Sequence, residues 1–309
     1  MNRTKWGMAA PAFVLLSHML WAQTAYRYRD ANGQWVFTDQ APASNAPADS
    51  FSLGHDKRAM HLSIIREDDA QSTRLTAVNE CLCVATFQVT ITHSAFNSIR
   101  EGADYRVTLQ PQSRQSVVQA TRPTSGSTEL QYRWRAALGS PDAMHSPGVP
   151  YRVPFGIGST YSITQAYPSR ITHLTPDSQY AVDIALPDGT PVYAAREGTV
   201  IDARQDFFRD AVAAVMLDRA NMIEILHSDG TIAIYAHLHW DSVRVRIGDH
   251  VVRGQYIADS GKTGFTSGPH LHFAVVRNTG VENVSIPFQF AGIGGIGVTP
   301  VTNMPLTAY

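Results

Sequence analysis

Charge is scarce in this sequence. Asp, Glu, Lys and Arg make up 17% of the residues, and the formal net charge is −1 at pH 7. A nucleic-acid-binding domain usually carries a clustered excess of Lys and Arg, and an acidic disordered tail carries a run of Asp and Glu. Neither pattern occurs here. We therefore expect no nucleic-acid partner, and an acidic polymer would have to be met by a local patch.

Cysteine is almost absent as well. The two residues of this type, Cys81 and Cys83, are spaced Cys-x-Cys. On a strand their side chains share one face. An oxidising compartment would permit a disulfide between them, although so small a ring is strained. Two thiols that pack as small hydrophobic side chains are the alternative of equal weight. Two ligands are too few for a metal site made of cysteines alone.

Long apolar runs are confined to the N-terminus. Arg3 and Lys5 precede an apolar run from Trp6 to Trp21, and small residues lie between Ala22 and Ala25. This pattern is typical of a secretory signal that is cleaved after Ala22 or Ala25. An uncleaved anchor is the alternative, but a bilayer span needs about 20 apolar residues. We expect a secreted protein, periplasmic or associated with the cell envelope, with no stable membrane span after signal removal.

Long amphipathic helices are also missing, and short strand-like runs take their place. Tyr26 to Asp39 predicts a hairpin around the turn cluster Asp30 to Gly33. This stretch resembles the small DUF4124-type module of secreted bacterial proteins, which implies no chemistry. Regularly spaced short strands after Phe51 suggest a β-sandwich. The Gly/Pro/Thr-rich tail after Ala291 is expected to be extended or mobile.

These patterns predict a mainly β protein, in which a small β-sandwich-like domain precedes an antiparallel β-sheet domain. The strands of the second domain are punctuated by Gly-containing turns. We divide the chain into a signal peptide (1–25), a hairpin module with its linker (26–50), a β-sandwich-like domain (51–138), a second linker (139–158) and the antiparallel domain (159–309).

The stretch from Gly261 to Phe273 carries the strongest chemical signal. It ends in His270-Leu-His272, within an alternating run that predicts a strand. Alternate residues of a strand point to the same face, so the two imidazoles would lie about 7 Å apart along it. Neutral imidazole is the commonest metal ligand and also serves in acid/base catalysis. A chance pair on a half-buried strand is the alternative, but the Gly-rich approach lets a substrate or another backbone come close.

Two upstream segments supply further candidate groups. His237 follows the apolar run that ends at Tyr235, and His173 precedes Asp183 in a Pro/Asp/Ser-containing loop. Catalytic zinc sites typically use three protein ligands of N and O type and leave one position open. His173, Asp183 and His272 would make such a set, and His237 and His270 would remain for chemistry.

Several motifs agree in order and spacing with those of one known family. The motifs are Tyr180 to Ala185, Gly189 to Ala195, Tyr235 to Leu238, Gly248 to Gly254 and Thr263 to Phe273. Together they resemble the M23 (LytM/lysostaphin-type) zinc endopeptidases, which cut peptide bonds in bacterial cell-wall peptidoglycan. The resemblance covers about Ser159 to Phe290 and implies an antiparallel β fold.

The resemblance implies a cofactor and a role for each of five residues. Zn²⁺ would be held by His173, Asp183 and His272, and a zinc-bound water would be the nucleophile, assisted by His237 and His270. The substrate would be the peptide stems of peptidoglycan. The sequence departs from the family at one point, because the common pattern is His-x3-Asp and nine residues separate His173 from Asp183 here. We interpret the segment as a longer-loop variant of the motif.

Two other functions are compatible with this resemblance. Some relatives of this fold have lost ligands and act as non-catalytic regulators or binding modules of the cell wall. In this chain all five residues are present, which favours an enzyme. Alternatively, the first half of the chain could bind or inhibit and keep the enzyme latent. Specificity is expected to depend on the loops Phe207 to Asp210 and Phe265 to Gly268. Of the remaining histidines, His227 is expected to lie in the core or a turn, and His250 is expected to be exposed.

Overall fold

The computed structural model describes residues 23–29, 35–38, 49–53, 62–122, 129–169, 171–212, 216, 219–280 and 282–309. The expected signal sequence up to Ala22 and the hairpin turn Asp30 to Gly33 lie outside the described residues. The chain divides into two compact units, Met1–Asp56 and Lys57–Tyr309. In the first unit, β1 (Gln23–Arg29) pairs antiparallel with β2 (Trp35–Thr38) and with β3 (Asp49–Leu53).

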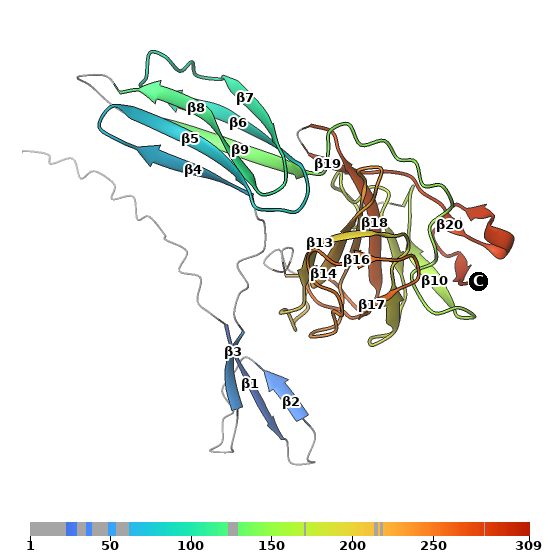
Figure 1. Ribbon diagram of the computed structural model, residues 1–309. Coiled ribbons are helices and arrows are strands. Elements are labelled where there is room, and N and C mark those ends of the chain that lie inside the picture. Colours follow the sequence, from blue (N-terminus) through green and yellow to red (C-terminus); the bar gives the residue numbers. More distant parts are fainter. Residues whose placement is uncertain are drawn as a thin grey trace, which may run out of the picture. The chain divides into compact units, whose positions relative to one another are not determined.

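The second unit begins with two three-stranded antiparallel sheets (Figure 1). Residues on alternate positions of each strand turn inward, as in β5, where Leu75 and Ala77 are fully buried. Leu75 packs with Val89 and Ile91 of the facing sheet, so the expected β-sandwich is confirmed. One sheet has β4 (Leu62–Asp68), β5 (Ser72–Asn79) and β8 (Ser113–Thr121), and the other has β7 (Asp104–Leu109), β6 (Ala85–Ser94) and β9 (Leu130–Leu138).

The C-terminal half is built on one nine-stranded sheet, in the order β16-β13-β14-β15-β18-β11-β10-β22, with β19 beside β18. The neighbouring strands in it pair antiparallel, as predicted. Its strands are β10 (Thr160–Gln165), β11 (Val182–Ile184), β13 (Gly198–Arg204), β14 (Met222–Leu226), β15 (Ile232–Ala236), β16 (His250–Val251), β18 (Leu271–Asn278), β19 (Asn283–Ser285) and β22 (Pro305–Thr307).

Two small ribbons accompany this sheet. The ribbons are β12 (Pro191–Tyr193) with β17 (Tyr256–Asp259), and β20 (Phe290–Ala291) with β21 (Gly297–Val298), next to the short 3-10 helix η2 (Ile293–Gly295). In the described part of the chain there is no α-helix, so the mainly β fold class is confirmed. Nor does any described helix have the length and apolar character that crossing a bilayer requires.

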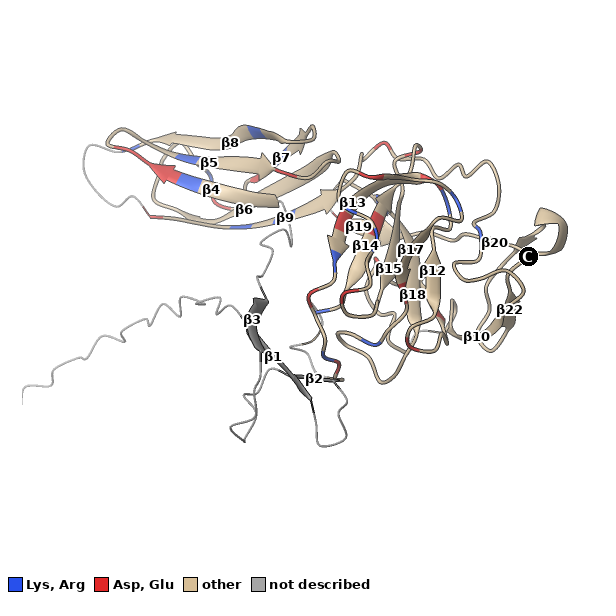
Figure 2. Ribbon diagram, turned by 60° about the horizontal axis from the view of Figure 1, so that its bottom comes forward, with Lys and Arg blue, Asp and Glu red and all other residues tan. Residues whose placement is uncertain are grey.

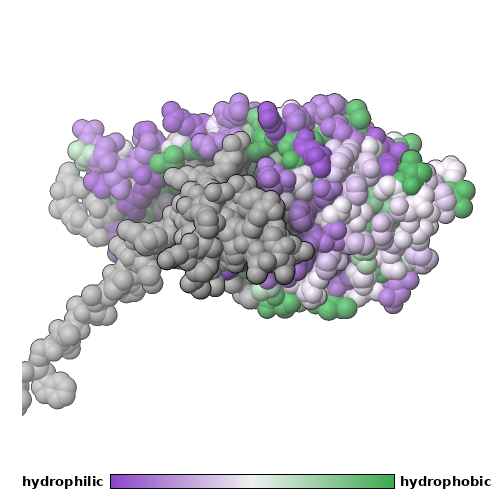
Figure 3. Space-filling view, turned by 90° about the horizontal axis from the view of Figure 1, so that it is seen from below, coloured by the Kyte–Doolittle hydropathy of each residue, from purple (hydrophilic) through white to green (hydrophobic). Residues whose placement is uncertain are grey.

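The nine-stranded sheet has two different faces. Leu271, Phe273 and Val275 of β18 pack into the main hydrophobic core with side chains of β14 and β15. His272, Ala274 and Val276 alternate with them and therefore point to the opposite face. Figure 3 shows that the coloured part of one side of the molecule is mostly hydrophilic or intermediate, with small separate hydrophobic spots.

Two segments pack more tightly than their composition suggests. Tyr151, Val153 and Phe155 lie in the main core, although they fall in the predicted linker. The tail after Ala291 is not simply extended or mobile, because β22 pairs with β10 and Leu306 is buried. In both segments apolar side chains occur between the Pro and Gly residues, and these side chains pack against the sheet. The limits proposed for the domains remain predictions.

Candidate metal centre

Asp183 and His272 meet because of strand register. β11 and β18 are antiparallel neighbours, and Asp183 lies directly opposite His272. Both side chains are on the face of the sheet that is turned away from the main core. Nδ1 of His272 lies 2.9 Å from Oδ1 of Asp183. The register of two short strands therefore fixes an imidazole beside a carboxylate.

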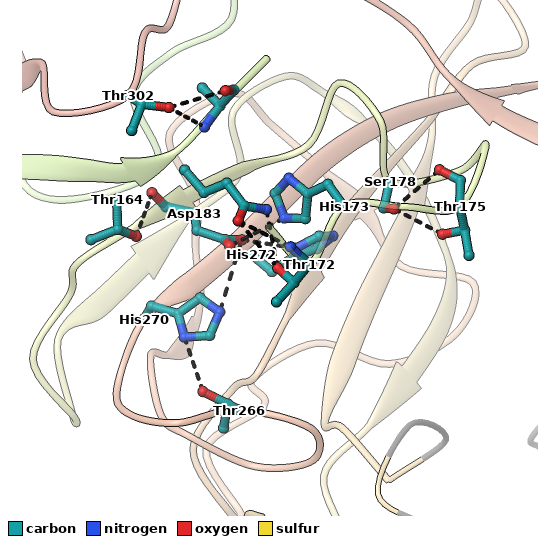
Figure 4. A network of polar contacts seen from close by, with 12 residues as sticks. Thr164, Thr172, His173, Thr175, Ser178, Asp183, Thr266, His270, His272 and Thr302 are labelled. Carbon is teal, nitrogen blue, oxygen red and sulfur yellow. Dashed lines mark hydrogen bonds and ion pairs between the residues drawn. The ribbon is translucent and has the colours of Figure 1, made fainter. Parts of the chain in front are cut away.

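His173 reaches the same carboxylate from the loop between β10 and β11. Its Nε2 lies 3.1 Å from Oδ2 of Asp183, and its ring stands edge-on to that of His272 with the centroids 5.0 Å apart. The preceding residue, Thr172, is held by Gln165 of β10, whose Oε1 accepts a hydrogen bond from the Thr172 backbone N–H. Figure 4 shows how these side chains converge from the loop and the two strands.

The three side chains fit a metal ion. One ligand atom from each of His173, Asp183 and His272 lies within 4.8 Å of the others. His173 is only 3% exposed, and neither of its ring nitrogens makes a hydrogen bond. Buried polar atoms without partners are costly. A divalent cation bound by two imidazoles and a carboxylate would take up one of these nitrogens, and this donor set is one that zinc prefers.

The charge of Asp183 is also preserved in this site. Burial by itself would raise the pKa of its carboxyl, but the imidazoles of His173 and His272 outweigh burial and hold that pKa well below its usual range. The carboxylate is therefore ionised at neutral pH. An ionised, buried carboxylate next to two imidazoles is suited to bind a cation.

His270 and His237 lie beside the three-residue group. Nδ1–H of His270 donates to the carbonyl of Gly268 at 2.9 Å, and Nε2 lies 3.8 Å from Oδ1 of Asp183. Nδ1–H of His237 donates to the carbonyl of Thr263 at 2.7 Å. The rings of the two histidines are 4.5 Å apart at their centroids. In each ring these hydrogen bonds place the proton on Nδ1 and leave Nε2 free to accept one.

His237 has an unusual backbone conformation and a lowered pKa. Its backbone φ is 63°, in the left-handed region that residues other than glycine rarely adopt. Burial, followed by the neighbouring His270 and His272, lowers the pKa of its imidazole to about 3. His237 is therefore neutral at physiological pH. Strain of this kind is often found at functional sites.

Close backbone contact joins the two loops that carry these histidines. Gly261 pairs with His270, and Leu238 pairs with Ser260. A Cβ atom on Gly261 would lie 2.6 Å from both the Cα and the N of His239. Only glycine permits this approach, so Gly261 sets the position of His237 relative to His270.

Of the other histidines considered, none joins this group. Nδ1 of His239 lies 2.8 Å from a carboxylate oxygen of exposed Asp188. His227 is buried, and its Nδ1–H donates to the carbonyl of Glu197, as expected for a core histidine. His250 is exposed, as predicted. Both cysteines are free and buried, so the disulfide alternative is not adopted in this structure.

Sequence reasoning missed the residues that orient the catalytic candidates. Thr263 supplies the carbonyl that accepts from His237. The hydroxyl of Thr266 lies 3.2 Å from Nδ1 of His270 and donates to the carbonyl of Gly268. Both threonines belong to the Gly-rich stretch that feeds β18. Their position in that motif was the available signal, but their carbonyl and hydroxyl contacts depend on the loop conformation.

Comparison with known proteins identifies a family for one segment. Residues 177–284 match the family model Peptidase family M23. The predicted resemblance is thus confirmed over a range that includes Asp183, His237, His270 and His272. His173 lies four residues before the start of the match, so its place in the group rests on the geometry alone.

Curated relatives share this segment. The chain is 32% identical to lysostaphin of Staphylococcus simulans over 130 residues, and the aligned segment covers 40% of this chain and 24% of lysostaphin. It is 33% identical over 144 residues to peptidoglycan DD-endopeptidase ShyB of Vibrio cholerae, covering 42% and 30% of the two chains. A solved structure of lysostaphin from Staphylococcus simulans is 31% identical, covers 38% of this chain and 43% of that chain, and has a TM-score of 0.30. The chain spans about a quarter to a third of the length of the curated relatives it matches first.

Proposed function

We propose that this chain is a secreted, zinc-dependent endopeptidase that hydrolyses the peptide cross-links of bacterial peptidoglycan. One observation supports the proposal above the others. Two imidazoles and an ionised carboxylate converge, no hydrogen-bond partner reaches Nδ1 of the buried His173, and two further imidazoles lie beside them. The similarity to lysostaphin and to a peptidoglycan DD-endopeptidase points to the cell wall as the substrate.

His173, Asp183 and His272 would hold the zinc ion. When bound, zinc polarises a carbonyl and lowers the pKa of a water molecule to about 7. The ionised state of Asp183 supplies the negative charge that this binding needs. Burial of His173 excludes water from one side of the group and strengthens the electrostatic interactions within it.

His237 and His270 would move protons. Each keeps its proton on Nδ1 through a backbone carbonyl, so each can accept a second proton at Nε2. Either imidazole can take the proton of an attacking water, and once protonated it can stabilise negative charge on the peptide carbonyl oxygen. The rings are 4.5 Å apart, and a charge on His270 disfavours protonation of His237.

Digestion of purified peptidoglycan tests this proposal. The zinc-loaded full chain should release fragments with new amino and carboxyl termini, and mass analysis would identify the bond. A His272→Ala variant should release none, whereas His239→Ala, which changes an imidazole outside the group, should cleave at a rate near that of the wild type. Intact muropeptides after digestion by the zinc-filled wild type would refute the proposal.

A non-catalytic regulator of the cell wall is the competing function. A chain with that role would tolerate loss of ligands or of the two assisting histidines. Here all five side chains are present and converge. The regulator hypothesis predicts that His270→Ala leaves the activity of the chain unchanged, and our proposal predicts a loss.

A further inference from the structure

The face of the sheet that carries the metal centre continues beyond it in regular rows. The first row crosses the strands through Arg204, Met222, Ala236, His272 and Asp183, which are partners in register. The second row lies two residues further along each strand, about 7 Å away. It consists of Asp202, Glu224, Ile234 and Ala274.

The β-sandwich covers the third row. Ile232 and Val276, which are again partners in register, pack against Cys81 and Cys83. Leu138 of β9 packs against the same cluster. Asn278 of β18 adds hydrogen bonds to the sandwich, from Nδ2 to the hydroxyl of Thr86 and to the carbonyl of Gly139. The sandwich therefore forms a wall across this face, two rows from the metal centre.

A cavity of about 250 Å³ lies between that wall and the second row. Ile234 gives it an apolar side, the buried Ile232 and Val276 close it at the base of the sandwich, and Leu62, Ala136 and Leu138 of the sandwich line it as well. Its charged lining residues are Asp177, Asp202, Glu224 and Arg204. Figure 2 shows acidic and basic residues together on β13 and β14, the strands that carry three of these groups.

The charges of this cavity do not balance. Three carboxylates face one guanidinium, and Arg204 is already paired with Asp202 at 2.6 Å. In the described part of the chain, no hydrogen bond or ion pair reaches the carboxylate of Glu224, which is half-buried. Burial, followed by the charge of Asp202, raises the pKa of Glu224 to about 7, against the opposing effect of Arg204. A cation is the group that would satisfy this carboxylate.

We propose that this cavity, the acidic subsite, binds an aliphatic side chain that ends in a primary ammonium group and belongs to the substrate peptide within two residues of the bond that is cut. The aliphatic stem would lie between Ile234 of the sheet and Ala136 and Leu138 of the sandwich, and the ammonium would reach Glu224. A four-carbon ammonium chain has five heavy atoms, which at roughly 30 Å³ each fit the cavity. The inference rests on the proposed function, because the side chain is part of its substrate.

The loop between His173 and Asp183 also contributes a residue to the acidic subsite. Asp177 lies in the loop between His173 and Asp183, and it lines the acidic subsite. The same loop therefore carries His173, a proposed metal ligand, and Asp177, a carboxylate of the subsite.

Binding without catalysis tests the subsite directly. The metal-free full chain would be titrated with the capped peptides acetyl-Ala-Lys-Ala-amide and acetyl-Ala-norleucine-Ala-amide, which differ only by the amine, and followed by NMR. We expect the lysine peptide to bind about tenfold more tightly, as for one charge-assisted hydrogen bond of about 1.5 kcal/mol. Glu224→Gln should abolish the preference, and Glu67→Gln, which changes an exposed acid of the sandwich, should not.

Two results would overturn the subsite: equal affinities of the wild type for the two peptides, or a preference that survives in Glu224→Gln. A second variant, Ala136→Leu, narrows the cavity from the sandwich side and should weaken the lysine peptide several-fold. A folded Ala136→Leu chain with unchanged affinity would exclude the sandwich as a wall of the site.

Digestion of peptidoglycan separates the two proposals. A wild type that cuts peptidoglycan but shows no preference for the amine refutes the subsite and keeps the proposed function. A wild type that prefers the amine through Glu224 but cuts nothing refutes the proposed function and keeps the subsite.

Discussion

At the scale of single residues, His173 shows how geometry adds to a motif. Its spacing from Asp183 departs from the common pattern, and the family match begins after it. The structure nevertheless brings its Nε2 to 3.1 Å from Asp183 and leaves both ring nitrogens without hydrogen bonds. A buried imidazole in this state is suited to act as a metal ligand.

Removal of that imidazole should therefore weaken metal binding. Loss of a residue that only supports a ligand typically costs 10–100-fold in affinity, so we expect His173→Ala to lose about 100-fold or more for zinc. Competition with a chelator measures the affinity, and His227→Ala serves as a control outside the group. An unchanged zinc affinity in His173→Ala would remove His173 from the ligand set.

A buried ion pair elsewhere gives a prediction for pH dependence. Nη1 of Arg196 lies 2.7 Å from Oδ2 of Asp229, and both side chains are 8% exposed. Burial alone would raise the pKa of Asp229, but hydrogen bonds from Thr231, Arg196 and the Ser146 backbone hold it well below its usual range. The folded state thus binds fewer protons than the unfolded state between about pH 4, the unfolded pKa, and the lower pKa of the folded state. Stability from this group is fully present above about pH 4 and is lost progressively as pH falls from there toward the folded-state pKa.

Asp229→Asn should lower the free energy of unfolding at neutral pH by about 3 kcal/mol, because it leaves Arg196 buried without its partner. The acid-induced loss of stability should also be smaller in this variant. Urea unfolding between pH 3 and 7 measures both effects. Glu197→Gln changes an exposed partner of Arg196, 3.7 Å away and 53% exposed, and should cost less than about 1 kcal/mol. Equal costs in the two variants would contradict the role of burial.

At the scale of elements, the positions of turns and loops decide whether the histidines meet. The sequence predicts the strand that carries His272, since alternation is a local property, although β18 begins at Leu271 and His270 makes only an isolated bridge to Gly261. It does not predict the contact of Gly261 with His239, because the two loops come together only through long-range pairing. The core position of Tyr151 and the pairing of β22 with β10 are hidden for the same reason.

Gly261→Ala tests that loop contact. The added Cβ would lie 2.6 Å from backbone atoms of His239, so the loops must separate. We expect a loss of about 1–3 kcal/mol in stability and a fall in peptidase activity of at least tenfold, because His237 moves relative to His270. Gly148→Ala is the matched control, since it lies outside the site and nothing lies within 4 Å of a Cβ there. Comparable activity in the two variants would show that the contact does not position His237.

At the scale of the whole molecule, the β-sandwich packs directly against the C-terminal sheet. Residues Lys57–Tyr309 form one compact unit, and Cys81 and Cys83 share a hydrophobic cluster with Ile232 and Val276 of the C-terminal sheet. The sequence predicts the sandwich from its short strands. Its position beside the cavity of the acidic subsite could not be predicted, because it depends on how two separately patterned sheets pack together.

Asn278 provides the test of this packing. It is fully buried, and its Nδ2 group donates to groups of the sandwich and of the segment after it. Asn278→Ala leaves those acceptors unsatisfied and should cost about 1–3 kcal/mol. Calorimetry should show one unfolding transition for Lys57–Tyr309 in the wild type and a lower or split transition in the variant. Two separate transitions in the wild type would contradict a single cooperative unit.

The central claim is that His173, Asp183 and His272 bind one zinc ion beside His237 and His270. Anomalous diffraction at the zinc edge from crystals of the zinc-loaded full chain tests it most directly. We predict one peak within about 2.0–2.3 Å of a ring nitrogen of each of the two histidine ligands and of a carboxylate oxygen of Asp183. A peak elsewhere, or no peak in zinc-loaded protein, would contradict the claim.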